Sequence, residues 1–258
     1  LASGDAFPTG VNTVIWKATD VGNNTATCSF TVTVTDNEKP SIVCPLNLVR
    51  GTDLNQCNSV VVYALPAYSD NCPGSGITLT SGLPSGATFP KGVNNVNWQV
   101  TDLGGNSAVC NFTVTVNDTQ APSITCPSNV VKGTDVGLCS AVVSYPLPTF
   151  SDNCPGGSQA LQSGGASGTV FLKGTSSVVW RATDAEGLTS QCTFTVTVND
   201  TQAPVITCPA SQTQTTALNF CTAIVTYTTP TFTDNCSGGS VSIQSGLPSG
   251  SPFPKGIN

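Results

Sequence analysis

The stretch that decides the fold starts at Val96, ends at Asn117 and reads VNWQVTDLGGNSAVCNFTVTVN. Apolar and polar side chains alternate in both halves, and β-branched and aromatic residues fill the apolar positions. This period of two is typical of strands with one buried face. The TDLGGN segment between the halves supplies the Asp and Gly that a tight turn needs. The stretch therefore predicts a β-hairpin.

The hairpin pattern recurs every 82 residues without insertion or deletion, as Trp16, Trp98 and Trp180 show. Four cysteines in each period keep the same register. Periods of this size indicate an array of similar modules rather than one large core. The predicted domains are the C-terminal part of a repeat at 1–36, complete modules at 37–118 and 119–200, and the N-terminal part of a repeat at 201–258. Because the chain opens and closes in the same part of the repeat, we expect a segment of a longer protein.

The sequence pattern of each complete module predicts an all-β fold, namely an immunoglobulin-like β-sandwich of about seven strands. Helical periodicity is absent from the sequence, and an earlier strand is expected at Ser59–Ala64. The linkers Asp36–Pro40, Asn117–Pro122 and Asn199–Pro204 are short and contain proline, which should limit bending between neighbouring modules. The chain is therefore expected to form an extended array of tandem sandwiches.

Composition excludes several classes of function. The net charge is −6, with 8 scattered basic residues, which argues against binding of nucleic acid. The sequence has no apolar run near the ~18 residues that a membrane-spanning helix needs, so no membrane insertion is expected. It also has no histidine, which rules out a Ser-His-Asp triad. The expectation is a protein that is not an enzyme.

The cysteines predict disulfides and an extracellular setting, because a module of about 80 residues has a small core and needs covalent support. Four cysteines allow three pairings in a module. In a sandwich, the first and last strands can run side by side, which favours Cys44 with Cys110 and leaves Cys57 with Cys72. Cys44 with Cys57 and Cys72 with Cys110 stays open as the competitor. The corresponding cysteines of the next module are Cys126, Cys192, Cys139 and Cys154.

Acidic residues recur in three loops that would share one end of such a sandwich: the entering linker, the DNC loop and the hairpin turn. Oxygen ligands that converge at a domain junction suit calcium, which takes about 6–8 of them. Calcium is the one cofactor that the pattern suggests. The alternative is that these aspartates only start turns and cap loops. The candidate ligands are Asp36, Asp70 and Asp102 in the first complete module and Asp118, Asp152 and Asp184 in the second.

Several separated motifs, in fixed order, resemble the hyalin repeat, or HYR module. They are DxxxPxIxCP at Asp36–Pro45, Asp118–Pro127 and Asp200–Pro209; DNC at Asp70–Cys72, Asp152–Cys154 and Asp234–Cys236; and FPxG at Phe7–Gly10, Phe89–Gly92 and Phe253–Gly256. The third repeat departs from the last motif, because Phe171–Gly174 reads FLKG. The resemblance implies immunoglobulin-type sandwiches and extracellular adhesion. Long arrays of the four-cysteine form resemble giant surface adhesins of Bacteroidota, exported by the type IX system, including SprB-like gliding adhesins.

The leading functional expectation is a stalk segment of a long extracellular adhesin or cell-surface filament, built from disulfide-stabilised spacer repeats. A stalk needs length and stiffness, and near-identical repeats supply both. Two alternatives remain open: the modules themselves bind glycan or protein, or chains pack laterally into a surface sheath or fibre. The expected partners are neighbouring repeats of the same chain, with surface glycans or other copies of the filament as further candidates.

Overall fold

The computed structural model describes residues 4–256, and all regular structure among them is β-strand. No described residue lies in a helix that could cross a membrane. Contacts between Cα atoms divide the chain into two compact units. Unit 1 comprises residues up to Ala121 together with the loop Asp152–Gly156, and unit 2 comprises Pro122–Ser151 and everything from Gly157 onward.

Unit 1 begins with an isolated hairpin of β1 (Gly10–Thr19) and β2 (Thr25–Val34), in which Trp16 lies opposite Cys28. The turn between the two strands is closed by Asp20, whose Oδ1 accepts hydrogen bonds from the N–H groups of Gly22 and Asn24. No second layer covers this hairpin among the described residues, and Trp16 is 63% exposed.

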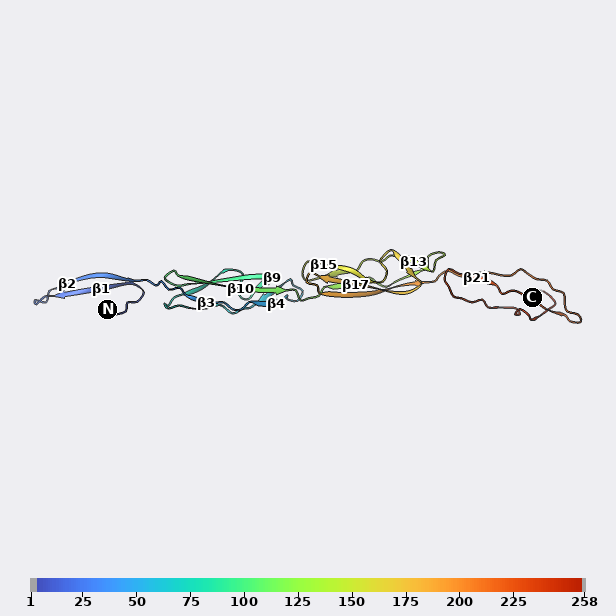
Figure 1. Cartoon of the computed structure of the whole chain (residues 1–258), viewed down its shortest axis with the longest axis horizontal. Coiled ribbons are helices and arrows are strands. Elements are labelled where there is room, and N and C mark those ends of the chain that lie inside the picture. Colours follow the sequence, from blue (N-terminus) through green and yellow to red (C-terminus); the bar gives the residue numbers. More distant parts are fainter. Residues whose placement is uncertain (1–3, 257–258) are drawn as a thin grey trace. The chain divides into compact units, whose positions relative to one another are not determined.

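Residues 37–118 form a two-layered sandwich of eight strands, one more than the sequence suggested. The larger sheet has the order β4-β10-β9-β7, and β4 runs parallel to β10 while the other neighbours are antiparallel. Figure 1 shows β4, β9 and β10 side by side. The second layer consists of the antiparallel pairs β3-β6 and β5-β8. The strands are β3 (Ser41–Val43), β4 (Leu48–Gly51), β5 (Asn58–Val61), β6 (Ala67–Ser69), β7 (Gly76–Ser81), β8 (Ala87–Pro90), β9 (Gly92–Thr101) and β10 (Ser107–Asn117).

The hydrophobic core follows the alternation in the sequence. Val96 and Trp98 of β9 and Phe112 of β10 are buried, whereas the polar residues between them face outward. They pack against Val61 and Phe89 of the second layer. This burial removes both large rings from water and explains the all-β fold, because only the pleat places every second residue on one face.

Unit 2 repeats this architecture with a sheet of order β12-β18-β17-β15 and the pairs β11-β14 and β13-β16. Two further pairs, β19-β21 and β20-β22, follow at its C-terminal end. The strands are β11 (Ser123–Thr125), β12 (Val130–Gly133), β13 (Ser140–Val143), β14 (Thr149–Ser151), β15 (Gly157–Ser163), β16 (Thr169–Leu172), β17 (Gly174–Asp184), β18 (Thr189–Asn199), β19 (Val205–Thr207), β20 (Thr222–Ile224), β21 (Thr231–Thr233) and β22 (Pro252–Pro254).

One disulfide joins the two layers of each sandwich. Cys44, directly after β3, is bonded to Cys110 of β10, with the Cα atoms 5.7 Å apart. The strand beside β10, however, is β4 and not β3, which pairs with β6 instead. The bridge therefore joins the two layers rather than two neighbouring strands. Cys126 and Cys192 form the same bridge in unit 2, with a Cα–Cα distance of 5.6 Å.

Candidate functional site

The DNC loop Asp152–Gly156 connects β14 to β15 but belongs to unit 1. Its Cys154 is bonded to Cys57, which lies 97 positions earlier in the preceding repeat. The Cα atoms of the two residues are 4.8 Å apart, and Cys154 is 3% exposed. A buried disulfide thus links two consecutive repeats.

The side-chain amide of Asn153 holds the DNC loop against the preceding repeat through hydrogen bonds. Its Nδ2 donates to the carbonyl oxygen of Gln56 at 2.9 Å and to Oδ1 of Asp118 at 3.1 Å. It also lies 3.4 Å from Oγ1 of Thr52. The loop β4–β5, which contains Thr52, Gln56 and Cys57, therefore receives the DNC loop of the next repeat through both a covalent bond and hydrogen bonds.

Asp118 is the acceptor at the centre of this arrangement, and it is 5% exposed. Its Oδ1 also accepts hydrogen bonds from the N–H of Gln120 at 3.1 Å and from the hydroxyl of Thr52 at 3.2 Å. Burial raises the pKa of the Asp118 carboxyl, but the hydrogen bonds from Gln120, Asn153 and Thr52 and the charge of Lys91 outweigh that effect. The pKa therefore lies below its ordinary value, and the group is held as a carboxylate.

The linker that leaves the repeat is held against the same loop. Oε1 of Gln120 accepts from the N–H of Asn55 at 2.9 Å, and its Nε2 donates to Oδ1 of Asn55 at 3.2 Å. Asn55 has a φ of 60°, a left-handed conformation that Asn tolerates better than most residues. Gly51 allows the close approach of Thr119, whose Oγ1 would lie 2.7 Å from a Cβ at that position.

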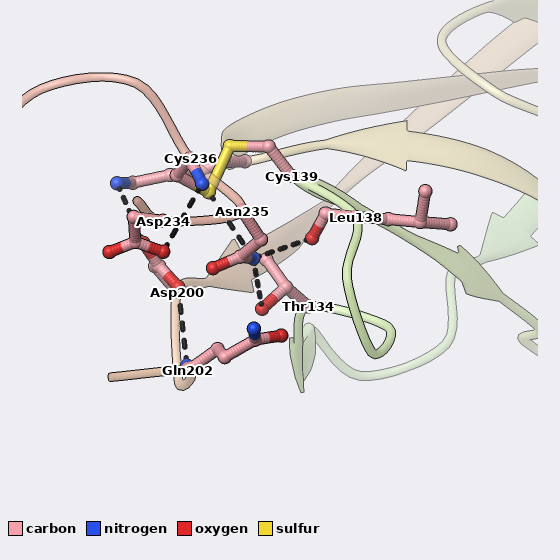
Figure 2. Close-up of polar contacts among 9 residues, drawn as sticks. Thr134, Leu138, Cys139, Asp200, Gln202, Asp234, Asn235 and Cys236 are labelled. Atoms are coloured by element: carbon pink, nitrogen blue, oxygen red, sulfur yellow. Dashed lines mark hydrogen bonds and ion pairs between the residues drawn. A yellow bond between two sulfur atoms is a disulfide. The ribbon is translucent and has the colours of Figure 1, made fainter. Parts of the chain in front are cut away.

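The same set recurs one repeat later, wholly inside unit 2, and Figure 2 shows it. Cys139 is bonded to Cys236, and Nδ2 of Asn235 donates to the carbonyl oxygen of Leu138 at 2.6 Å. The Asn235 amide also lies 3.3 Å from Oγ1 of Thr134. Gln202 accepts from the N–H of Gly137, which takes the left-handed place of Asn55 with a φ of 73°. We call each set the inter-repeat clamp: Thr52, Cys57, Asp118, Asn153 and Cys154 in unit 1, and Thr134, Cys139, Asp200, Asn235 and Cys236 in unit 2.

Two expected disulfides are wrong, namely Cys57 with Cys72 and Cys139 with Cys154. Cys57 lies at the end of its repeat where the outgoing linker passes, because neighbouring Asn55 bonds Gln120. Cys72 lies beside Asp36 of the incoming linker. The two cysteines therefore lie near opposite linkers of the repeat. Cys57 is bonded instead to Cys154, in the DNC loop of the next repeat. The competitor pairing, Cys44 with Cys57 and Cys72 with Cys110, is also wrong, because Cys44 holds Cys110.

The structure brings together the three aspartates that the sequence singled out in the first complete module. Carboxylate oxygens of Asp36, Asp70 and Asp102 lie within 4.8 Å of one another. For Asp118, Asp152 and Asp184, which are divided between the two units, the calcium prediction stays a prediction. Asp184 is 6% exposed, and its Oδ1 accepts from the N–H groups of Glu186 and Leu188.

Sequence reasoning missed the roles of two amides, Asn153 in the clamp and Gln120 in the linker beside it. A signal for both was present, because the DNC motif and the linker NDTQAP recur with unchanged amides at Asn235 and Gln202. What the sequence lacked was any indication that these amides act between repeats rather than within one.

The fold and the clamp define a class: tandem β-sandwich modules in which a disulfide and an asparagine fasten each module to the next. The model of the HYR domain matches at residues 1–34, 35–116, 117–198 and 199–258, so the chain belongs to the HYR domain family. Hyalin of Strongylocentrotus purpuratus is 34% identical over 98% of this chain and 22% of that protein. Hyalin of Lytechinus variegatus is 31% identical over 90% of this chain and 44% of that protein, so the chain spans less than half of either relative.

Among solved structures, the protocadherin GammaB4 extracellular domain is similar, with 17% identity and a TM-score of 0.36. The similarity covers 96% of this chain and 51% of that chain. At this TM-score the match carries no argument about function.

Proposed function

We propose that this chain is a spacer segment of a long extracellular adhesion protein, a stalk whose repeats are joined covalently as well as by the backbone. The matched hyalins support an extracellular repeat protein of the adhesion type, and the disulfides require an oxidising compartment. The clamp is a structural device, and a role without catalysis fits it best.

The observation that carries the proposal is the overlap of the four disulfides. They join Cys44 to Cys110, Cys57 to Cys154, Cys126 to Cys192, and Cys139 to Cys236. Each loop begins before the previous one has ended. Every peptide bond between Cys44 and Cys236 is therefore spanned by at least one disulfide.

This overlap has a consequence that pairing within repeats would lack. A single cut in the linker Asn117–Pro122 would separate two repeats if Cys57 were bonded to Cys72. With Cys57 bonded to Cys154, the same cut leaves the two sides covalently joined. A stalk outside the cell is exposed to proteases and to tension, and such a bond pattern preserves its length after single breaks.

Complete trypsin digestion tests the proposal on the whole chain, after unpaired thiols have been alkylated and without reduction. Trypsin should cut after Lys17, Arg50, Lys91, Lys132, Lys173, Arg181 and Lys255, whereas Pro40 protects Lys39. The observed disulfides would then hold peptides 18–50, 51–91, 92–132, 133–173 and 182–255 in one complex, which reduction would dissolve. Release of free 51–91 or 133–173 before reduction would contradict the interlocked stalk.

A second candidate function is glycan binding by the outer face of the larger sheet of unit 1. A shallow hollow of about 510 Å³ is lined by Asn47, Asn95, Asn97 and Asn111. Amides suit sugar hydroxyls, but Phe112 is 3% exposed and Trp98 is 8% exposed, so neither ring is available as a stacking platform. Glycan-array binding that is lost in Asn97→Ala would favour this function. Lateral packing of chains and the Bacteroidota gliding-adhesin context stay predictions.

A further inference from the structure

Three separate loops of unit 1 bring carboxylates to one point. Asp36 comes from the linker that enters the repeat, Asp70 from the loop after β6, and Asp102 from the turn between β9 and β10. One oxygen from each lies within 4.8 Å of the others. Like charges at this distance repel unless a cation or a proton compensates them.

Two of the three carboxylates are held in place by their own loops. Oδ1 of Asp36 accepts from the N–H of Glu38 at 3.1 Å. Oδ1 of Asp102 accepts from the N–H of Asn106 at 2.7 Å, and Oδ2 accepts from the Asn106 amide at 2.9 Å. That amide also donates to the carbonyl oxygen of Asp36 at 3.0 Å, which ties the linker to the turn.

Asp70 has no such support. Both of its carboxylate oxygens are buried, each with less than 1 Å² exposed, and neither has a hydrogen-bond partner among the described residues. Burial of an unpaired carboxylate is costly, so a buried carboxylate is normally paired, neutralised or bound to a metal. The Asp70 carboxylate is therefore a buried group without a hydrogen-bond partner among the described residues, and it lies beside two other carboxylates.

At the equivalent aspartates one repeat later, carboxylate oxygens are again buried without a hydrogen-bond partner in the described part of the chain. Oδ2 of Asp118, Oδ1 of Asp152 and Oδ2 of Asp184 are each buried without a hydrogen-bond partner among the described residues. Asp118 is 5% exposed and Asp184 is 6% exposed. Turn and cap roles account for the other oxygens of these residues, as in Asp184, but they leave these three unexplained.

We propose that Asp36, Asp70 and Asp102 bind one calcium ion, which fastens the entering linker to the repeat. All three ligands are hard oxygen donors on separate loops, and calcium accepts irregular sets of about 6–8 oxygens at about 2.3–2.6 Å. Magnesium demands a near-ideal octahedron and gives up water reluctantly, so it suits three loose loops less well. Small closing movements of the loops and added water would complete the shell.

Titration calorimetry of the full chain with calcium chloride tests the site, and Asp70→Asn is the decisive variant. Asp70 makes no hydrogen bond, so the substitution removes charge without breaking a contact. We expect the calcium stoichiometry to fall by one. Asp20→Asn is the matched control, because Asp20 has the same turn role as Asp102 in the isolated hairpin and bonds Asn24 in the same way. It should leave the stoichiometry unchanged.

Thermal unfolding gives a second readout, because Asp70→Asn should change the melting temperature in opposite directions with and without calcium. Extracellular modules bind calcium with a Kd of about 10⁻⁴–10⁻³ M, so ~10 mM calcium should raise the melting temperature of this repeat by about 6–15 °C. In EDTA, Asp70→Asn should melt at a temperature equal to or above that of the parent chain, because it relieves repulsion. In calcium it should melt below the parent chain.

Three results would overturn the proposal. The first is no calcium binding by the parent chain, and the second is unchanged stoichiometry in Asp70→Asn. The third is binding of zinc rather than calcium that disappears in Cys72→Ser, because it would assign the cluster to a thiolate-bound metal.

Discussion

Removal of the disulfide between Cys57 and Cys154 is the sharpest perturbation that the fold offers. The double variant Cys57→Ser/Cys154→Ser deletes the covalent part of one clamp and leaves Asn153 and its hydrogen bonds in place. We expect the repeat 37–118 to lose stability, because the unfolded chain gains the freedom that the closed loop denied it.

The magnitude follows from the loop length. The disulfide spans 97 residues, which corresponds to about 4.7 kcal/mol in the chain-entropy model. The disulfide between Cys44 and Cys110 offers a shorter path, so the loop that is actually closed has roughly 60 residues. Because the dependence on length is logarithmic, the expected loss falls only to about 4 kcal/mol.

Hydrogen exchange of the β10 amides, followed by mass spectrometry under non-reducing conditions, isolates this repeat from its neighbours. Cys72→Ser is the control and should exchange like the parent chain, because Cys72 is not bonded to Cys57. If Cys72→Ser lost about as much protection as the double variant, Cys57 would pair with Cys72 in solution, and the clamp would be refuted.

Three further predictions concern the non-covalent part of the unit 1 clamp. Asn153→Ala should lower the free energy of unfolding by about 1–3 kcal/mol, because the Gln56 carbonyl and the Asp118 carboxylate each lose a hydrogen-bond donor. Urea unfolding measures this loss, and Asn111→Ala, at an exposed position, is the control. Gly51→Ala should destabilise by about 1–3 kcal/mol through the clash with Thr119, and Thr119→Ala should restore part of the loss. The lowered pKa of Asp118 stabilises the fold above about pH 4, and this contribution is lost as the pH falls through the folded-state pKa. Asp118→Asn should therefore flatten the acid limb of a plot of stability against pH, and an unchanged limb would contradict the assignment.

Local chemistry made the hairpin predictable. Every second residue is buried from Val96 to Val100 in β9 and from Phe112 to Val116 in β10, as the alternation indicated. The turn at Asp102 is closed by its own carboxylate. The expected strand at Ser59–Ala64 was too long, since β5 ends at Val61. The N–H of Tyr63 donates to the Ser85 side chain instead, so it leaves the ladder. Strand ends depend on such partners, which a period of two does not reveal.

The pairing of Cys57 could not be decided from the sequence for a reason that lies in the repeat itself. Cys72 and Cys154 are separated by one full period of 82 residues, so they occupy equivalent positions and have the same neighbours in the DNC motif. Any local rule that selects one selects the other. Only the place of the DNC loop in the fold distinguishes Cys72 from Cys154 as the partner of Cys57. The DNC loop lies at the end of its repeat where the incoming linker enters, so it meets the outgoing end of the previous repeat. Because the repeats are near-identical, their sequence does not show whether a contact closes within a module or reaches the next. Here two disulfides lie within a module and two join consecutive modules.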